Sequence, residues 1–351
     1  MIRFKYDELA KWLRDNINNG TFKHGDRIPT ENELALQFNV SRDTVRKAIS
    51  RLEEESLLKR VQGSGTYVNL PDIREISSLR KDSHTIGIMM NDINSYIFSY
   101  IVKGIKETLS RYGYTTSVHF TANKISLERN ILESFIAGDY AGLIIEPTKA
   151  ALPLLNYDLY QKISTSIPTV TIHAKIPQLP ISSVTMADEK GAYMLTKYLL
   201  DNGHSNIAIF LKSDEQTGTN RYVGYCKAYQ DAGLPINDDN IFWLYSGITP
   251  SYFEIFLDNT AREKIFENTA IICHDDRLAL QLKHYLAKQN INNDVIVCGF
   301  DNSDIAQKNG FTSVSHMQEK FGEYAALRLI ELIKAPGSDV SLEITPSLTV
   351  R

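Results

Sequence analysis

Residues 41–68 read "SRDTVRKAISRLEEESLLKRVQGSGTYV", a basic helical pattern followed directly by a run that glycines interrupt. Apolar residues between positions 42 and 54 recur at the spacing of one helix face, and Ser41 suits the cap that begins such a helix. Two short β-prone runs then flank the Gly-Ser-Gly tip at 63–65, which predicts a β-hairpin. By itself this stretch fits a solvated basic helix beside a tight turn as well as a surface that binds DNA.

Two further helical segments precede this stretch. Apolar residues recur at helical spacing from Lys5 to Asn18, and Thr30 with Glu33 forms the pattern of a capping box at the start of a second helix. A short turn separates the second helix from the third, which predicts a helix-turn-helix. With the hairpin behind it, the unit is a winged helix-turn-helix, which we expect to span residues 1–70.

The third helix carries the side chains best suited to reading DNA. Arg42 and Arg46 lie one turn apart near its start, on the arc turned away from the apolar face. A recognition helix presents its first turns to base edges, and the arginine fork fits the O6 and N7 atoms of guanine. Ser41 or Thr44 is placed to hold a phosphate, and Lys47 adds a cation to the same arc.

Composition limits the classes to which the chain can belong. Its 351 residues, 43% apolar and 23% charged, are enough for two or three soluble domains. Residues 1–70 carry a net charge of +2 and the remainder −6, which is weak support for a nucleic-acid-binding head on an acidic body. Residues 71–84 have mixed charge and no sustained period, so we expect a linker there.

Several other functions are not favoured. No signal-peptide core or run of roughly 18 apolar residues occurs, so we expect a cytoplasmic protein, nucleoid-associated when DNA-bound, with no membrane partner. Cys226, Cys273 and Cys298 lack metal-ligand spacing and predict buried, reduced thiols, with no metal or cofactor. The motifs HExxH, GxSxG and GxxxxGK[ST] are absent. Glycoside hydrolysis in an acidic cleft stays open as the enzyme alternative.

From residue 85 to residue 351, short apolar strands alternate with helices, and the pattern restarts after Ser182. This predicts an α/β fold of two doubly wound parallel-sheet lobes with a cleft between them. Ligands of such sheets bind beyond the carboxyl ends of the strands, so side chains that follow the predicted strands are candidates. Aromatic faces and charged groups together suit a small polyol.

Ten side chains fit this description, and we expect them to bind the effector: Tyr96, Phe98, Glu146, Lys149, His173, Asp188, Gln216, Arg221, Asp276 and Asp301. Each also has a plainer role. Asp276 suits a helix cap, Asp301 suits a hinge brace, and Glu146 suits an ion pair with Lys149 that serves no ligand.

The segments "GDRIPTENELA", "VSRDTVRKAI" and "GSGTYV" resemble the DNA-binding domain of the GntR family over most of residues 1–70. Asp43 departs from what DNA favours, because it is an acid where a neutral or basic residue would serve better. The resemblance implies that operator double-stranded DNA is contacted by Lys5, Glu31, Arg42, Asp43, Arg46, Gln62, Gly63 and Gly65.

The segments "AGLIIEP", "NRYVGYCKAYQDAG", "AIICHDDRLALQLKHYL" and "VIVCGFDNSDIA" resemble the effector domain of the LacI/GalR family over nearly all of residues 84–351. That family is built like periplasmic sugar-binding proteins, and the resemblance implies that Arg221 and Asp276 hold the effector. The combination with a GntR-type head resembles the arabinose repressors of Gram-positive bacteria. It implies a homodimer that a small sugar, L-arabinose, releases from its operator. Another pentose, a hexose or a disaccharide, and a corepressor role, stay open.

Overall fold

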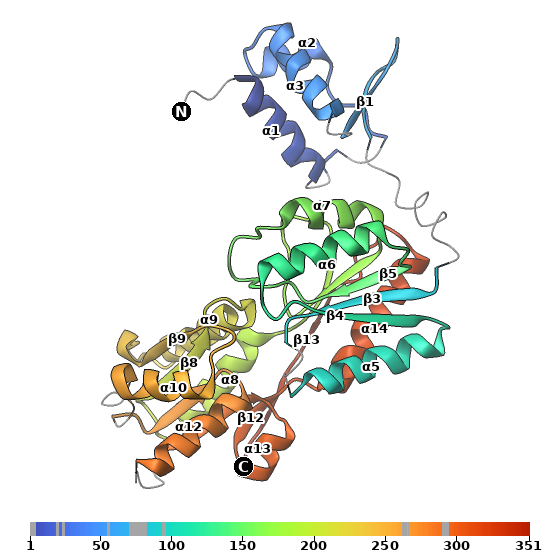
Figure 1. The fold of residues 1–351 in the computed structure, drawn as a ribbon. Coiled ribbons are helices and arrows are strands. Elements are labelled where there is room, and N and C mark those ends of the chain that lie inside the picture. Colours follow the sequence, from blue (N-terminus) through green and yellow to red (C-terminus); the bar gives the residue numbers. More distant parts are fainter. Residues whose placement is uncertain are drawn as a thin grey trace.

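The computed structural model describes residues 5–18, 21–22, 25–54, 57–69, 83–92, 96–261, 265, 267–289 and 295–351. Figure 1 shows a small N-terminal head and a larger body of two sheet-containing lobes. We call the described residues of 83–186 and 318–344 lobe 1, and those of 188–316 and 347–351 lobe 2. Most of the predicted linker, residues 71–82, lies outside the described residues.

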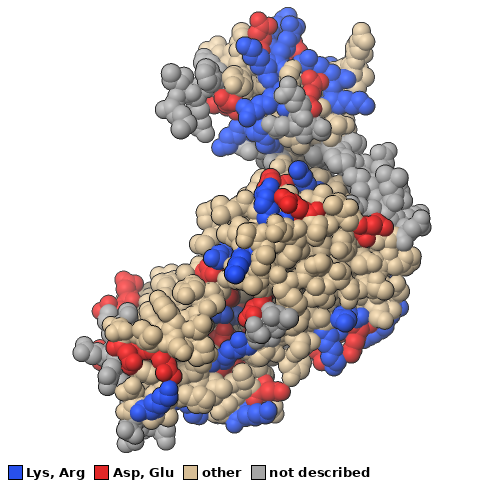
Figure 2. Space-filling model, viewed as in Figure 1, with Lys and Arg blue, Asp and Glu red and all other residues tan. Residues whose placement is uncertain are grey.

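The head has the predicted order of three helices and a hairpin. Its elements are α1 (Lys5–Asn18), α2 (Glu31–Gln37), α3 (Arg42–Glu54), β1 (Leu58–Val61) and β2 (Gly65–Val68). The capping box at α2 is confirmed, because the Thr30 hydroxyl accepts from the Glu33 N–H at 3.3 Å and Glu33 accepts from the Thr30 N–H at 2.7 Å. Apolar side chains from all three helices and both strands form the core of the head. In Figure 2, Lys and Arg side chains gather over this head.

Lobe 1 is a parallel sheet with the strand order β13-β7-β6-β5-β3-β4 and helices on both faces. Its strands are β3 (Thr85–Met90), β4 (Thr115–Phe120), β5 (Gly142–Ile145), β6 (Thr169–Ile172), β7 (Ser182–Met186) and β13 (Leu342–Ile344). One face is covered by α5 (Phe98–Arg111) and α14 (Gln318–Lys334), and the other by α6 (Ile125–Ala137) and α7 (Tyr157–Ser166).

Lobe 2 repeats this build with the order β14-β12-β11-β10-β8-β9, in which only β14 is antiparallel to its neighbour. Its strands are β8 (Ile207–Lys212), β9 (Ile241–Leu244), β10 (Ala270–Cys273), β11 (Ile296–Asp301), β12 (Thr312–Ser315) and β14 (Ser347–Thr349). Its helices are α8 (Asp188–Asp201), α9 (Gln216–Asp231), 3-10 helix η1 (Asp238–Asn240), α10 (Pro250–Phe256), π-helix η2 (Leu257–Ala261), α12 (Asp276–Lys288) and α13 (Asp304–Asn309).

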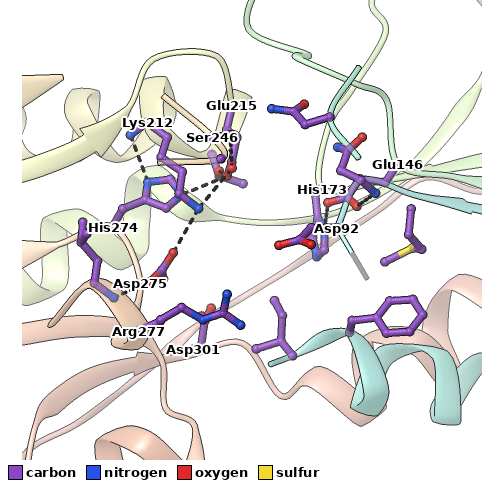
Figure 3. Close-up of a pocket in the computed structure, with 18 of the residues that line it drawn as sticks. Asp92, Glu146, His173, Lys212, Glu215, Ser246, His274, Asp275, Arg277 and Asp301 are labelled. Carbon is purple, nitrogen blue, oxygen red and sulfur yellow. Dashed lines mark hydrogen bonds and ion pairs between the residues drawn. The ribbon is translucent and has the colours of Figure 1, made fainter. Parts of the chain in front are cut away.

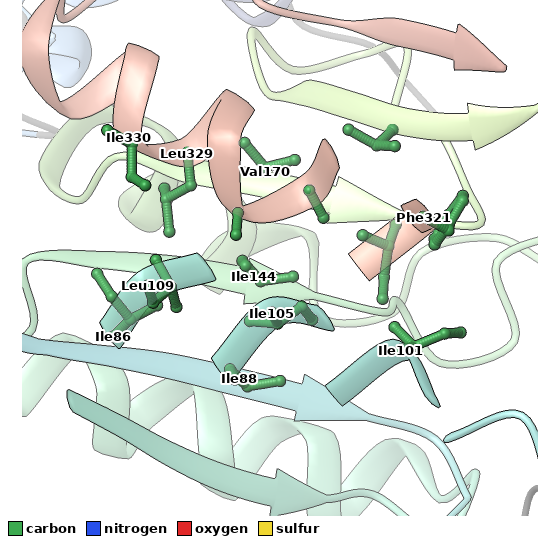
Figure 4. Packing of buried hydrophobic residues seen from close by; sticks show 14 of the residues in the cluster. Ile86, Ile88, Ile101, Ile105, Leu109, Ile144, Val170, Phe321, Leu329 and Ile330 are labelled. Carbon is green, nitrogen blue, oxygen red and sulfur yellow. The ribbon is translucent and has the colours of Figure 1, made fainter. Parts of the chain in front are cut away.

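The restart of the pattern after Ser182 suggested that the two lobes are consecutive stretches of chain, but the structure shows that they are not. Helix α14 follows lobe 2 in sequence but packs in lobe 1, where Phe321 and Leu329 join the cluster around Ile105 (Figure 4). Helix α5 approaches α14 so closely that a Cβ atom on Gly104 would lie 2.1 Å from the carbonyl oxygen of Glu319. A helical pattern does not reveal which of two similar sheets a helix covers, so sequence periodicity missed this crossing.

Two other expectations were tested by the fold. No helix among the described residues is long and apolar enough to span a membrane. All three cysteines are free, and Cys273 and Cys298 are buried as predicted, whereas Cys226 is only half-buried. Burial raises the pKa of the Cys298 thiol to about 12, so this thiol is held in its protonated form.

Candidate functional site

The exposed arc of α3 carries the predicted cations. Arg42, Arg46 and Lys47 are exposed, while the opposite side of the helix is buried in the core of the head. The Nε atom of Arg46 lies 2.9 Å from a carboxylate oxygen of Glu31 at the start of α2, and Arg60 on β1 lies 3.8 Å from the same carboxylate. Glu31 therefore connects the recognition helix to the hairpin, through an arginine that sequence reasoning did not select.

The remaining head residues lie around this arc. The Ser41 hydroxyl accepts from the Thr44 N–H at 3.2 Å, which confirms Ser41 as the cap of α3, and it lies 2.9 Å from the Thr44 hydroxyl. The Asp43 side chain is 86% exposed and 4.0 Å from Arg46. Gln62 and Gly63 are exposed at the tip of the hairpin.

Two positions need separate mention. Gly65 has φ +142°, and a Cβ atom there would lie 2.6 Å from Nε of Arg27, so the turn requires glycine. The side chain of Lys5 lies outside the described residues, although its backbone begins α1.

A cavity of about 490 Å³ lies between the lobes, where the carboxyl ends of the two sheets face each other. Nine of the ten predicted effector residues line it: Tyr96, Phe98, Glu146, Lys149, His173, Asp188, Gln216, Arg221 and Asp301. Asp276 does not. Selecting side chains that follow the predicted strands thus identified most of the predicted effector residues correctly as cavity-lining.

On the lobe 1 side, Glu146 is the central acid. Its carboxylate accepts from the Asn91 N–H at 2.8 Å and lies 2.9 Å from Nδ1 of His173. The His173 ring stacks on Phe321, and its φ of +61° is rare for a side chain of this size. Burial lowers the pKa of His173, but the bond and the charge of Glu146 outweigh burial, so the net shift is upward. Glu146 therefore pairs with His173 and not with Lys149.

Lys149 differs from the other cations of the cavity. No acid pairs with its ammonium group among the described residues, and its φ is +51°. Lys212 is paired with two carboxylates, and Arg221 with another. Lys149 is thus a half-buried cation with free donors on a cavity wall, which makes it suited to a ligand hydroxyl.

Arg221 is already engaged by the protein. Its guanidinium lies 2.7 Å and 2.8 Å from Asp188, donates to the carbonyl of His274 at 2.5 Å, and stacks over Phe300 at 4.0 Å. Its Nη2 atom, one of the two nitrogens that face Asp188, also lies 3.3 Å from Nε2 of His316. Most of its donors are therefore used within lobe 2, and its main role in this arrangement is to hold the cavity wall.

The prediction that Asp276 contacts the effector needs correction. Its carboxylate is fully buried and does not line the cavity, and it accepts from the Ser303 N–H, the Ser303 hydroxyl and the Ser313 hydroxyl at 2.7–2.8 Å. These partners lie on or beside β11 and β12, so Asp276 braces the turn that follows Asp301. Its neighbour Asp275, which does line the cavity, is the N-cap of α12 and accepts from the Leu278 N–H.

Asp301 and Asp276 are buried neighbours with opposite pKa shifts. Burial, followed by the charge of Asp301, raises the pKa of Asp276 to about 7. Burial acts in the same direction on Asp301, but His316, 2.8 Å away, and the charge of Arg221 bring its pKa to about 2. The charged form is therefore favoured at Asp301 over Asp276.

Sequence reasoning missed a second polar cluster on the lobe 2 side (Figure 3). Lys212 lies 3.3 Å from Glu215 and 3.0 Å from Asp275, and Glu215 lies 3.0 Å from Nε2 of His274 and 2.5 Å from the Ser246 hydroxyl. All of these residues line the cavity. Lys212 and His274 stand at or just after the ends of β8 and β10, so the strand-end rule could have found them.

The charges of the cavity limit its ligand. Its lining includes six carboxylates and four cations. Of the cations, Lys212 and Arg221 pair with acids of the protein, and Arg277 stacks over Tyr96. An anionic ligand would meet net repulsion, whereas a neutral polyol finds both donors and acceptors. Among the described residues, no group of three or more His, Cys, Asp or Glu side chains could hold a metal ion.

Comparisons with known proteins give two family matches, one in the head and one in the second half of the body. Residues 5–68 match the family described as "Bacterial regulatory proteins, gntR family", and residues 196–351 match the "Periplasmic binding protein-like domain". The solved complex of the transcriptional regulator CelR with cellobiose superposes with a TM-score of 0.67 at 20% identity, covering 92% of this chain and 99% of that one. A LacI-type regulator from Alkaliphilus metalliredigens bound to D-xylulofuranose gives 0.66 at 22% identity, covering 77% and 98%. These likenesses establish the fold.

Two curated relatives extend along the whole chain. The arabinose metabolism transcriptional repressor of Geobacillus stearothermophilus is 35% identical over 99% of this chain and 96% of its own length. The repressor of the same name from Halalkalibacterium halodurans is 30% identical, with the same coverage. With its gntR-type head and its periplasmic-binding-protein-like body, this chain belongs to the family of arabinose metabolism transcriptional repressors.

Proposed function

We propose that this transcriptional repressor binds its operator as a homodimer and that L-arabinose, bound between the lobes, releases it. The observation that carries the proposal is the polar cavity between the lobes, in a chain related over nearly its full length to arabinose repressors. The protein is a regulator, and its operator and a sugar effector are its partners. It acts in the cytoplasm, on the nucleoid when DNA-bound.

We assign residues 1–70 to DNA binding, residues 71–84 to a linker, and residues 85–351 to effector binding and dimerisation. Exposure of the α3 arc and the hairpin tip supports an operator surface that reads bases with Arg42, Arg46 and Gln62. The other contacts that we propose are Lys5, Glu31, Ser41, Asp43, Thr44, Lys47, Gly63 and Gly65.

The nine predicted residues that line the cavity are the proposed effector contacts. Lys149 and Glu146 present a donor and an acceptor to hydroxyl groups, and Tyr96 and Phe98 present ring faces to C–H groups. Asp188 and Arg221 hold the lobe 2 wall, together with His173, Gln216 and Asp301 on the rims.

A homodimer follows from the size of the head. A single winged domain contacts few bases, so useful specificity needs two heads on a two-fold operator. The exposed apolar side chains Trp243, Tyr245, Tyr252 and Ile255, on and beside β9 and α10, support a self-association surface on lobe 2.

The direct test is an operator titration with the full chain, with and without saturating L-arabinose. We expect operator affinity to fall about 5- to 150-fold with sugar, the usual range of allosteric coupling. Tighter operator binding with sugar would make the sugar a corepressor. If D-xylose, D-ribose or cellobiose changes operator affinity and L-arabinose does not, the effector is that other sugar.

Calorimetry on a matched pair tests the cavity itself. Lys149→Met should weaken the binding of L-arabinose, because the variant loses a cavity cation that no acid of the described residues pairs with. Lys175→Met should not, because that ammonium pairs with Glu343 outside the cavity, at 3.0 Å. Equal affinities for both variants would remove Lys149 from the site.

A further inference from the structure

Tyr96 belongs to lobe 1 but makes its polar contacts in lobe 2. It follows β3 and precedes α5, and its hydroxyl donates to the carboxylate of Asp301 and accepts from the N–H of Asp276 at 3.2 Å. Arg277 of lobe 2 lies over its ring, 5.1 Å from the centroid. In the first turn of α5, the Tyr100 hydroxyl donates to Asp304 at 3.1 Å. Two tyrosines thus connect the lobes along one rim.

The lobe 2 acceptors of this rim are held in place. Asp301 and Asn302 have φ values of +98° and +47°, conformations that non-glycine residues rarely adopt. Asp276 fixes the turn through both Ser303 and Ser313, so Asp301 is presented toward lobe 1. Asp276, which the sequence analysis assigned to effector binding, therefore supports the contact between Tyr96 and Asp301 instead.

A second set of contacts connects the lobes elsewhere. The Asn123 amide of lobe 1 donates to Asp214 of lobe 2 at 3.1 Å, and the Ala151 N–H donates to the Asp214 carbonyl at 3.3 Å. Gln216 exchanges two bonds with the backbone of Lys175, at 2.7 Å and 3.2 Å. Each of these bonds crosses from lobe 1 to lobe 2.

Four of the residues that bridge the lobes also line the cavity. Tyr96, Asp301, Asn123 and Gln216 all belong to its wall, whereas Tyr100 does not. Bringing the lobes together therefore builds the bridges and completes the cavity in one step. We propose that Tyr96 is the latch of this closure, the residue through which an occupied cavity holds the two lobes together and sets operator affinity.

The latch has a definite thermodynamic consequence, which rests on the proposed function. If the sugar-free protein is mainly open, the sugar binds the closed form more tightly by a fixed factor and the operator binds the open form, a weaker latch lowers both sugar affinity and operator release at saturating sugar. A residue that contacts the sugar equally in both forms would lower affinity but leave release at saturation unchanged, because the ratio of sugar affinities for the two forms stays the same.

Amide hydrogen exchange at saturating L-arabinose tests the latch directly, because the closed form is then the populated one. Tyr96→Phe removes only the hydroxyl and keeps the ring under Arg277. We expect amide hydrogen exchange at Asp276 to rise roughly 10- to 100-fold, the factor that a lost hydrogen bond to a charged group carries. The amides of Lys175 and Ala151, which face lobe 2 through the other set of bridges, should rise with it.

Tyr100→Phe is the matched control, because it removes an interlobe hydroxyl that is outside the cavity on a side chain 39% exposed. Its effect on the same amides should be about fivefold or less. Exchange that rises in Tyr96→Phe at Asp276 alone, or nowhere, overturns the latch. An unchanged denaturation midpoint would show that the variant is folded.

The second measurement uses the operator. In Tyr96→Phe, the affinity for L-arabinose and the fold-drop in operator affinity at saturating L-arabinose should both decrease, by similar factors. Unchanged release at saturation contradicts the latch. If the wild-type chain does not respond to L-arabinose at all, the proposed effector is wrong, and the same two measurements with the sugar that does release the operator decide the latch.

Discussion

The head and the cleft each hold an arginine against an acid at nearly the same distance, and the two pairs have different consequences. Arg46 lies 2.9 Å from Glu31 with side chains 56% and 29% exposed, whereas Arg221 lies 2.7 Å from Asp188 with side chains 4% and 2% exposed. An exposed pair contributes little and exchanges its partner readily. A buried pair is costly to break, because the remaining charge cannot reach water. The head thus offers its arginine to another partner, and the cleft keeps its own.

The largest expected effect is the loss of the buried acid. Asp188→Ala leaves the Arg221 guanidinium without its carboxylate, and the free energy of unfolding should fall by roughly 3–5 kcal/mol. Chemical denaturation measures it. Asp201→Ala, on the same helix and paired with Lys197 at the surface, is the control and should cost under about 1 kcal/mol. Similar losses in both variants would abolish the contrast between buried and exposed pairs.

The next effect concerns DNA. Arg46→Ala should weaken operator binding by roughly 1–3 kcal/mol and relax base preference at one position. The free energy of unfolding should hardly change. Gel-shift titrations at fixed salt measure the affinity. Arg51→Ala is the control on the same helix, because Arg51 is turned toward α1, where it pairs with Asp7 at 2.5 Å. An Arg46→Ala protein with full operator affinity would mean that α3 does not read the operator.

A smaller effect follows from the pair Glu146 and His173. Because the pKa of folded His173 is raised above 6.5, its protonated form stabilises the fold below that pH, and the gain is lost as the pH rises through the folded pKa. In Glu146→Gln, burial acts without the acid, so the pKa should drop. Ring titration by NMR measures it, with His119, whose pKa burial alone lowers, as the unchanged reference. An unmoved His173 pKa would contradict the assigned cause.

The smallest effect is expected at the exposed pair. Glu31→Gln should change the free energy of unfolding by no more than about 1 kcal/mol, and added salt should reduce the difference further. Chemical denaturation at low and high salt tests this. A loss comparable to that of Asp188→Ala would mean that Glu31 braces the head as Asp188 braces the cleft.

Local signals explain what the sequence predicted. The capping box at Thr30, the hairpin around Gly63, the strand before Glu146 and the strand that ends at Asp301 depend on residues a few positions apart. The structure contains all of them. Nine effector candidates line the cavity because strand ends share one edge of a sheet.

Distant partners explain what it missed. The direction of Asp276 depends on Ser303 and Ser313, 27 and 37 residues away, and the pairing of Glu215 with His274 spans 59. Those contacts form only when the chain has folded, and no short-range pattern records them. The same holds for α14, whose apolar stripe would fit either lobe.

The placement of α14 also determines the order in which the body can be completed during synthesis. When the ribosome has made residue 186, strands β3 to β7 exist, but the helix that covers half of one face and the edge strand β13 are still more than 130 residues from being made. Lobe 1 must therefore wait with apolar surface uncovered until lobe 2 has been translated, while the head has its own core from the first 70 residues. A nascent chain of this repressor would thus have a foldable DNA-binding head long before it has a working sensor.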